Sequence, residues 1–160
     1  MSGKISDDYV GVLTHLGNAL YRQGKTGESI QTLRKAVQLD PTSGPVLQNL
    51  GNILLMVNQT EEAIRLYRAA IQVSPQNNAL HFNLALAFRK QGQIAEAVFS
   101  MEQALRLSPE DVEGHLVLGQ LYEKLQQYED AIEAYKRALA LRPNHAEAHS
   151  RLALLKQYHE

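Results

Sequence analysis

Two arrangements of histidine in this chain have spacings that could bind a metal ion. His81 and His115 lie 34 residues apart, and His145 and His149 have the four-residue spacing that places two imidazoles on one helix face. A metal centre needs a further ligand, and Glu147 would point to another side of that helix. We therefore interpret His81 and His115 as partly buried structural side chains, and His145 and His149 as surface ones. We expect no metal.

Three pairs of adjacent carboxylates are the second candidate for chemistry, because acid and base catalysis often uses two carboxyl groups. Adjacent residues on a helix do not face one another, and acids at a helix start are stabilised by the macrodipole. There is no nucleophile spaced to meet a base, no phosphate-binding glycine loop and no cysteine. The chain is thus expected to be no enzyme and to need no cofactor. The pairs are Glu61–Glu62, Glu110–Asp111 and Glu129–Asp130.

The elements that carry these side chains repeat along the sequence. Four prolines recur every 34 residues, and several apolar columns recur with them at helical spacing. A period of this length is typical of a helix-turn-helix unit that must stack on its neighbours to bury its apolar face. The columns are Pro41, Pro75, Pro109 and Pro143; Leu16, Leu50, Leu84 and Leu118; Leu33, Tyr67, Met101 and Tyr135; and Ala36, Ala70, Ala104 and Ala138.

We predict an all-α fold, an α-solenoid of four such units that forms a single domain over residues 1–160. The repeats are expected at 10–43, 44–77, 78–111 and 112–145, with a capping helix at 146–160. The first helix should begin near Tyr9, capped by Ser6 or Asp7.

One column holds a small residue inside the first helix of every repeat: Gly17, Gly51, Ala85 and Gly119. A glycine within a helix costs roughly 1 kcal/mol relative to alanine, so its recurrence needs a reason. We expect that a side chain there would push the paired helix away, with the alanines at 63, 97 and 131 as the facing surface.

The turns have their own signals. Between the two helices of a repeat lie Gly24, Asn58, Gly92 and Gln126, where a left-handed residue would end the first helix. After each proline a polar side chain could cap the next helix, namely Thr42 or Ser43, Asn77, Asp111 and Asn144.

This pattern resembles the tetratricopeptide repeat over about residues 10 to 145, nearly the whole chain. The Leu-Gly, Tyr, Ala and Pro columns match the family, and one column departs from it. Where the family often places tryptophan, this chain has Leu13, Leu47, His81 and His115. The resemblance is specific for the fold and implies a protein-binding role without naming the partner.

Composition agrees with a protein-binding module. The net charge of −1 and the absence of a basic stripe give no case for nucleic acid, and no apolar run is long enough for membrane insertion. No secretory signal is visible in the first eight residues, so we expect a cytoplasmic protein.

In proteins that this chain resembles, the first helix of each repeat lines a concave groove that holds an extended peptide. That resemblance places Asn18, Asn49, Asn52 and Asn83 along the groove, and asparagine amides can bind a peptide backbone of any sequence. The asparagines resemble those on the inner face of the O-linked N-acetylglucosamine transferase superhelix. The alternative is that they only solvate a concave surface or bond to adjacent helices.

Other groove positions are apolar or basic. Met56, Phe82 and Leu86 would form side-chain pockets, while Arg89, Lys90 and Lys124 would tune charge. By the same column comparison, Leu116 and Val117 should also line the groove. A clamp for a C-terminal carboxylate, known in parts of the family, is rejected because Thr14, Ala79 and Asn83 stand where its cations would be.

The end of the chain leaves alternatives open. Leu152 and Leu155 can cover the last repeat, whereas Leu154 and Tyr158 would stay exposed. The last helix is thus either a true cap or the edge of a stack cut from a longer protein. We expect a monomeric peptide-binding scaffold; the alternatives are a self-assembling structural protein and a substrate-presenting module of a larger protein such as a glycosyltransferase.

Overall fold

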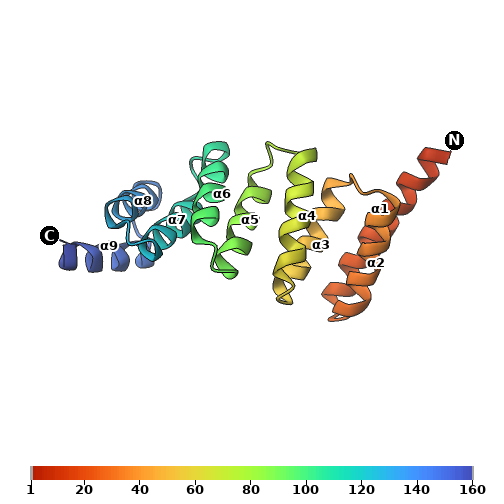
Figure 1. The fold of residues 1–160 in the computed structure, drawn as a ribbon, viewed down its shortest axis with the longest axis horizontal. Coiled ribbons are helices and arrows are strands. Elements are labelled where there is room, and N and C mark those ends of the chain that lie inside the picture. The colour runs from red at the N-terminus through yellow and green to blue at the C-terminus, as the bar shows by residue number, and fades with distance from the viewer. Residues whose placement is uncertain (1, 160) are drawn as a thin grey trace. The chain divides into compact units, whose positions relative to one another are not determined.

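The structure, a computed structural model, describes the backbone of residues 2–159 and the side chains of residues 8–157. Within these residues it contains nine helices and no strand, which confirms the predicted all-α solenoid of helix-turn-helix repeats (Figure 1). The helices are α1 (Ser2–Arg22), α2 (Thr26–Leu39), α3 (Gly44–Met56), α4 (Thr60–Val73), α5 (Asn78–Lys90), α6 (Ile94–Leu107), α7 (Val112–Lys124), α8 (Tyr128–Leu141) and α9 (Ala146–His159).

The helices group into two compact units. The first, Met1–Gln76, contains α1 to α4, and the second, Asn77–Glu160, contains α5 to α9. In each unit the two helices of a repeat pack on each other, and the second helix also contacts the first helix of the repeat that follows. The prediction of one domain over the whole chain stays a prediction.

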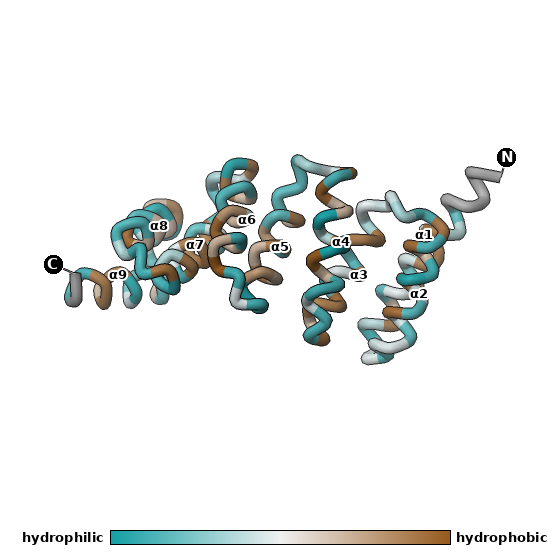
Figure 2. Tube along the Cα trace, in the orientation of Figure 1, coloured by the Kyte–Doolittle hydropathy of each residue, from teal (hydrophilic) through white to brown (hydrophobic). Residues whose placement is uncertain are grey.

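The core of each unit comes from the columns that the sequence repeats. Leu33, Tyr67, Met101 and Tyr135 are fully buried, as are the four alanines of the next column except for slight exposure of Ala104. Polar and apolar residues alternate along every helix, as expected when one face is buried and another meets solvent (Figure 2).

The turn between the two helices of each repeat has the predicted left-handed residue. Backbone φ is 77° at Gly24, 66° at Asn58, 78° at Gly92 and 60° at Gln126. The residue after each one donates its amide to a carbonyl five positions back, for example Lys25 N to Leu20 O at 2.9 Å. Glutamine therefore accepts in the fourth repeat a conformation that suits glycine better.

The helix starts differ from the prediction in three places. Helix α1 begins at Ser2, so Ser6 and Asp7 lie inside it and cannot precede it as caps; their side chains lie outside the described residues. Ser43 precedes α3 without a side-chain cap bond, and Pro45 in the first turn has no N–H to satisfy. Asn144 is also not the cap of α9, because Ala148 N donates to His145 Nδ1 at 3.3 Å.

The other two predicted caps are confirmed. Asn77 Oδ1 accepts from Ala79 N, and Asp111 Oδ1 accepts from Gly114 N, each at 3.1 Å.

The alanines at 63, 97 and 131 were expected to face the glycine column, but a Cβ added at these glycines would first meet a larger side chain of the second helix. A Cβ at Gly119 would lie 2.6 Å from Tyr135 Cε1, and one at Gly51 would lie 2.9 Å from Tyr67 Cε1. The closing side chain of the second helix thus occupies the space. In the third repeat, Ala85 is paired with the flexible Met101, and both are buried.

Helix α9 packs on α8 as the predicted terminal helix. Ala148 and Leu155 are buried in one cluster with Ala131, Tyr135 and Ala138, and Leu152 is partly buried against it. Leu154 is 50% exposed, as expected, and the Tyr158 side chain lies outside the described residues. None of the described helices combines the length and apolarity required to span a membrane.

The aromatic contact predicts a graded set of glycine substitutions. Gly119→Ala should lower the free energy of unfolding by roughly 1–3 kcal/mol through overpacking, and Gly51→Ala by less. Adding Tyr135→Met to Gly119→Ala should recover part of the loss, because the third repeat combines alanine with methionine.

Urea unfolding followed by circular dichroism measures these effects, with Gly27→Ala as the matched control. Nothing lies within 4 Å of a Cβ at Gly27, so this helical substitution should leave stability unchanged or raise it by up to about 1 kcal/mol. A Gly119→Ala protein as stable as the Gly27→Ala protein would contradict the assignment.

Candidate functional site

The predicted peptide-binding residues lie on the first helices of the repeats, and all of them except Leu116 and Val117 are at least partly exposed. In the first unit, Asn18 of α1 and Asn49 and Asn52 of α3 are half-exposed, and Met56 is 68% exposed. In the second unit, residues on α5 and α7 continue the same columns. These are the half-exposed Phe82, Asn83, Leu86 and Arg89, and the exposed Lys90 and Lys124.

Asn18 and Asn49 are notable because the described residues offer their amides no hydrogen-bond partner. The two side chains come from α1 and α3, helices that contact each other within the first unit. Each amide has two donor hydrogens and one acceptor oxygen. These groups are therefore available for a ligand at no loss of an internal bond.

Asn52 is held by the core beneath it. The hydroxyl of the fully buried Tyr67 donates to Asn52 Oδ1 at 2.7 Å. Burial raises the pKa of the Tyr67 phenol, so this group stays a donor at any ordinary pH. The bond turns the oxygen of the Asn52 amide toward the core and so sets the orientation of the side chain.

Met56 lies next to α1. The hydroxyl of Tyr21 is 3.6 Å from Met56 Sδ, a weak contact between two helices of the first unit. The thioether is otherwise exposed, which fits the expected role of an adaptable apolar contact.

Two groove positions predicted in the fourth repeat are wrong. Leu116 and Val117 are 2% and 4% exposed, and Leu116 belongs to the cluster that α8 and α9 form. Leu116 packs in this cluster with Ala148 and Leu155 of α9, and Val117 is buried on the same helix α7.

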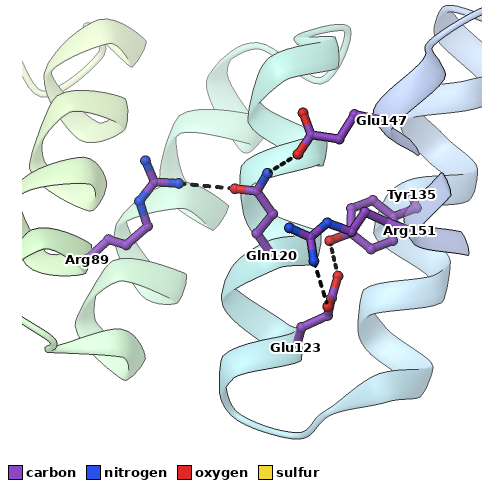
Figure 3. Close-up of polar contacts among 6 residues, drawn as sticks. All are labelled: Arg89, Gln120, Glu123, Tyr135, Glu147 and Arg151. Atoms are coloured by element: carbon purple, nitrogen blue, oxygen red, sulfur yellow. Dashed lines mark hydrogen bonds and ion pairs between the residues drawn. The ribbon is translucent and has the colours of Figure 1, made fainter. Parts of the chain in front are cut away.

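Arg89 forms part of a polar chain across three first helices of the second unit (Figure 3). Arg89 Nη1 on α5 donates to Gln120 Oε1 on α7 at 3.1 Å, and Gln120 Nε2 donates to Glu147 Oε1 on α9 at 2.8 Å. A cation at its oxygen and an anion at its nitrogen fix the orientation of the glutamine amide. Arg89 therefore already donates one of its hydrogen bonds to another residue of this chain.

A second polar contact lies one turn further along α7 (Figure 3). The Tyr135 hydroxyl donates to Glu123 Oε1, and Arg151 Nη1 of α9 lies 3.5 Å from Glu123 Oε2. Burial and the carboxylate of Glu123 raise the pKa of the Tyr135 phenol. The two contacts together balance two arginines against two glutamates.

Gln120 shares the groove column of Asn18, Asn52 and Leu86, so it was expected on the same face, and Glu147 was considered only as a metal ligand. No pattern in the sequence indicated Glu123 or Arg151. Glu123 and Arg151 lie 28 residues apart and share no column, so only the packing of α9 brings them together.

Two of the histidines bond loop carbonyls, and among residues 8–157 no group of three metal-ligating side chains is close enough to hold a metal ion. His115 Nε2 lies 2.8 Å from Pro109 O, and His149 Nε2 lies 2.7 Å from Pro143 O. A carbonyl oxygen only accepts hydrogen bonds, so each ring must donate from Nε2. The proline carbonyl lies in the loop between two helices, and the histidine satisfies it in place of a helical N–H. His149 is thus exposed, as expected, and also anchors the loop before α9.

The arrangement suits recognition by hydrogen bonds and apolar contact. It combines amides without partners, amides oriented by the core, and exposed apolar and basic groups.

The Tyr67–Asn52 bond gives a testable link between core and surface. Tyr67→Phe should lower the free energy of unfolding by about 0.5–1.5 kcal/mol, the net value of one such hydrogen bond. It should also release the Asn52 amide, visible as a shift of its side-chain NH₂ signals in a nitrogen–proton NMR spectrum. Tyr21→Phe is the control, because its exposed hydroxyl makes only the weak sulfur contact. Unmoved Asn52 signals in the Tyr67→Phe protein would contradict the link.

Comparisons with known proteins agree with the repeat architecture. A tetratricopeptide repeat model matches residues 86–146 and 116–155, and a TPR repeat model matches residues 17–58 and 51–92. Among curated protein sequences, none matches this chain.

Several solved structures are similar in fold. A MamA crystal structure superposes with a TM-score of 0.90 at 18% identity, covering 94% of this chain and 82% of MamA. YrrB, described as a TPR protein with an unusual peptide-binding site, gives 0.81 at 19% identity over 91% and 75%. PilF of Pseudomonas aeruginosa gives 0.79 at 22% identity over 96% and 70%. With the family models spanning residues 17–155, this chain belongs to the tetratricopeptide repeat family of protein-interaction modules.

Proposed function

We propose that this chain is a non-catalytic scaffold that holds an extended peptide segment against the first helices of its repeats. In the first unit, Asn18, Asn49 and Asn52 would bind the peptide backbone, and Met56 would contact its side chains. In the second unit, Asn83 would play the same backbone role, with Phe82 and Leu86 as the apolar contacts.

The observation that carries this proposal is the state of the Asn18 and Asn49 amides. They lie on neighbouring helices, are half-exposed and have no partner among the described residues. A peptide unit needs one donor and one acceptor, and an asparagine amide supplies both. Asn52 beside them is already oriented by Tyr67, which lowers the entropy lost on binding.

The basic groups favour a partner segment with acidic side chains. Lys90 and Lys124 are exposed at the ends of α5 and α7, and Arg89 donates to Gln120. Exposed charges of this kind mainly affect association rate and partner choice. The family and the YrrB neighbour support peptide recognition as the general activity.

The first test removes the two amides that have no internal partner. Asn18→Ala and Asn49→Ala together should weaken binding of a peptide by roughly tenfold to a hundredfold, because each net hydrogen bond contributes about 0.5–1.5 kcal/mol. The peptide is first selected from a displayed random library on the unmodified protein, and its affinity is then measured by calorimetry.

Thermal melts of the double variant should match those of the parent, since neither amide has a bond to lose. Asn144→Ala, an exposed asparagine before α9, is the matched control and should bind normally. Unchanged affinity in the folded double variant would reject this surface as the peptide site.

A second candidate function is self-association, and exposed apolar side chains favour it. On α1, Val12 is 60% and Leu16 is 47% exposed, although their equivalents Val46 and Leu50 on α3 are each 1% exposed. Leu154 on α9 is 50% exposed as well. A surface of this composition is typical of a contact between protein chains.

If copies associate through these faces, light scattering should show concentration-dependent dimers in the micromolar range. Leu16→Lys should then weaken the dimer if the face of α1 is used, and Leu154→Lys if that of α9 is used. Glu113→Lys, on an exposed position of α7, controls for the change of charge. A protein that stays monomeric at high concentration would leave peptide binding as the function.

A further inference from the structure

The second unit contains a cavity of about 700 Å³ on a different surface from the proposed peptide site. It lies between the second helices α6 and α8, and α7 forms its floor. Its size falls in the range of pockets that hold a small ligand or a few side chains of a partner. Nothing in the repeat columns alone predicts an opening at this position.

One end of the cavity is acidic. Glu102 of α6 accepts a hydrogen bond from the Tyr122 hydroxyl at 2.7 Å, and Asp130 of α8 lines the same cavity. Burial raises the pKa of the Tyr122 phenol, and the hydrogen bond to Glu102 and the charges of Glu102 and Asp130 raise it further. Among the described residues, neither carboxylate forms an ion pair.

The first unit shows what normally occupies this place. Arg34 of α2 bridges to Glu62 of α4, with Nη2 2.7 Å from Oε2. Sixty-eight residues later, two repeats on, the same two positions hold Glu102 and Asp130. The arginine that closes the gap between the second helices is thus replaced by a second acid.

Glu102 is the only acidic residue in its repeat column, in which the other three residues are basic. That column reads Arg34, Arg68, Glu102 and Lys136, and the facing column reads Glu28, Glu62, Glu96 and Asp130. Only Glu102 breaks the pairing of base with acid. Two arginines also line the cavity, and neither restores the pairing. Arg137 Nε lies 3.4 Å from Glu133 on the same helix, and Arg106 forms no ion pair among the described residues.

An independent indication of a binding site lies at the other end of the cavity. His115 lines this end, is only 6% exposed, and donates from Nε2 to Pro109 O. Its Nδ1 is therefore an acceptor, and within the described part of the chain it has no partner. A buried acceptor without a donor is uncommon and points to a bound group or water that supplies one.

We propose that this cavity docks an arginine side chain of a partner polypeptide, which takes the place that Arg34 has between α2 and α4. The guanidinium carries five donors in a planar fork, so it can bond the Glu102 and Asp130 carboxylates together. Arginine fits better than lysine because the site presents two acceptors on separate helices. The rest of the cavity accommodates the residues beside the arginine and reaches toward His115.

The probe for this test is the blocked pentapeptide Ac-Ala-Ala-Arg-Ala-Ala-NH₂, with the same peptide containing citrulline as its uncharged match. Titrated into the isotope-labelled protein, the arginine peptide should shift amide signals of α6 and α8 around Glu102, Asp130 and Ala134. The same peptide with lysine in place of arginine should bind more weakly, and the citrulline peptide should cause no comparable shifts. Binding of the arginine peptide should weaken as salt is raised.

Two variants of the cavity and one control variant separate the cavity from the rest of the surface. Glu102→Arg recreates the Arg34–Glu62 arrangement with Asp130 and should reduce affinity for the peptide at least tenfold. Glu102→Gln keeps an oxygen for the Tyr122 hydroxyl and should reduce affinity through loss of charge alone. Glu113→Arg makes the same change of charge at an exposed position of α7 outside the cavity and should bind normally.

The Asn18→Ala/Asn49→Ala protein should also bind the arginine peptide normally, which separates this site from the proposed peptide surface. Equal shifts with the citrulline peptide, shifts confined to other helices, or unchanged affinity in a folded Glu102→Arg protein would each overturn the proposal.

Discussion

The contact between a glycine on the first helix of a repeat and an aromatic ring from the second helix sets how closely the two helices pack. At Gly51 and Gly119 the ring of Tyr67 or Tyr135 occupies the space that a Cβ would need. The same rings extend through the pair to the opposite face, where their hydroxyls bond Asn52 and Glu123. The position of the polar surface therefore depends on a contact in the core.

Much of the fold could be predicted because its cause is periodic. Columns of glycine, tyrosine, alanine and proline that share one 34-residue interval leave few alternative positions for the helices. The turns follow the same interval, and Gly24, Asn58, Gly92 and Gln126 show the expected left-handed backbone. The early start of α1 was missed because it precedes the first repeat, where no copy exists for comparison. The cap at His145 was missed although it shares the column of the caps Asn77 and Asp111, because histidine is not among the usual capping residues.

The candidate site was predictable only in part. The columns placed Asn18, Asn49 and Asn52 on partly exposed helix faces, but they could not show that Tyr67 holds one amide while the other two lack partners. Arg89 was expected to face a ligand, whereas it donates to Gln120. Such pairings depend on side-chain reach across helices, and residues 28 to 31 positions apart meet only because the helices stack.

The inversion at Glu102 also has a consequence for how such a chain evolves. Copies made by duplication begin as equivalents, and exchanging them by recombination would preserve the helices, the turns and the glycine–tyrosine contacts. A copy with the Arg34 type of residue at position 102 would face Asp130 and bridge the gap as Arg34 does with Glu62. The order of the repeats thus carries information that the fold itself does not require, and natural selection can act on that order independently of stability.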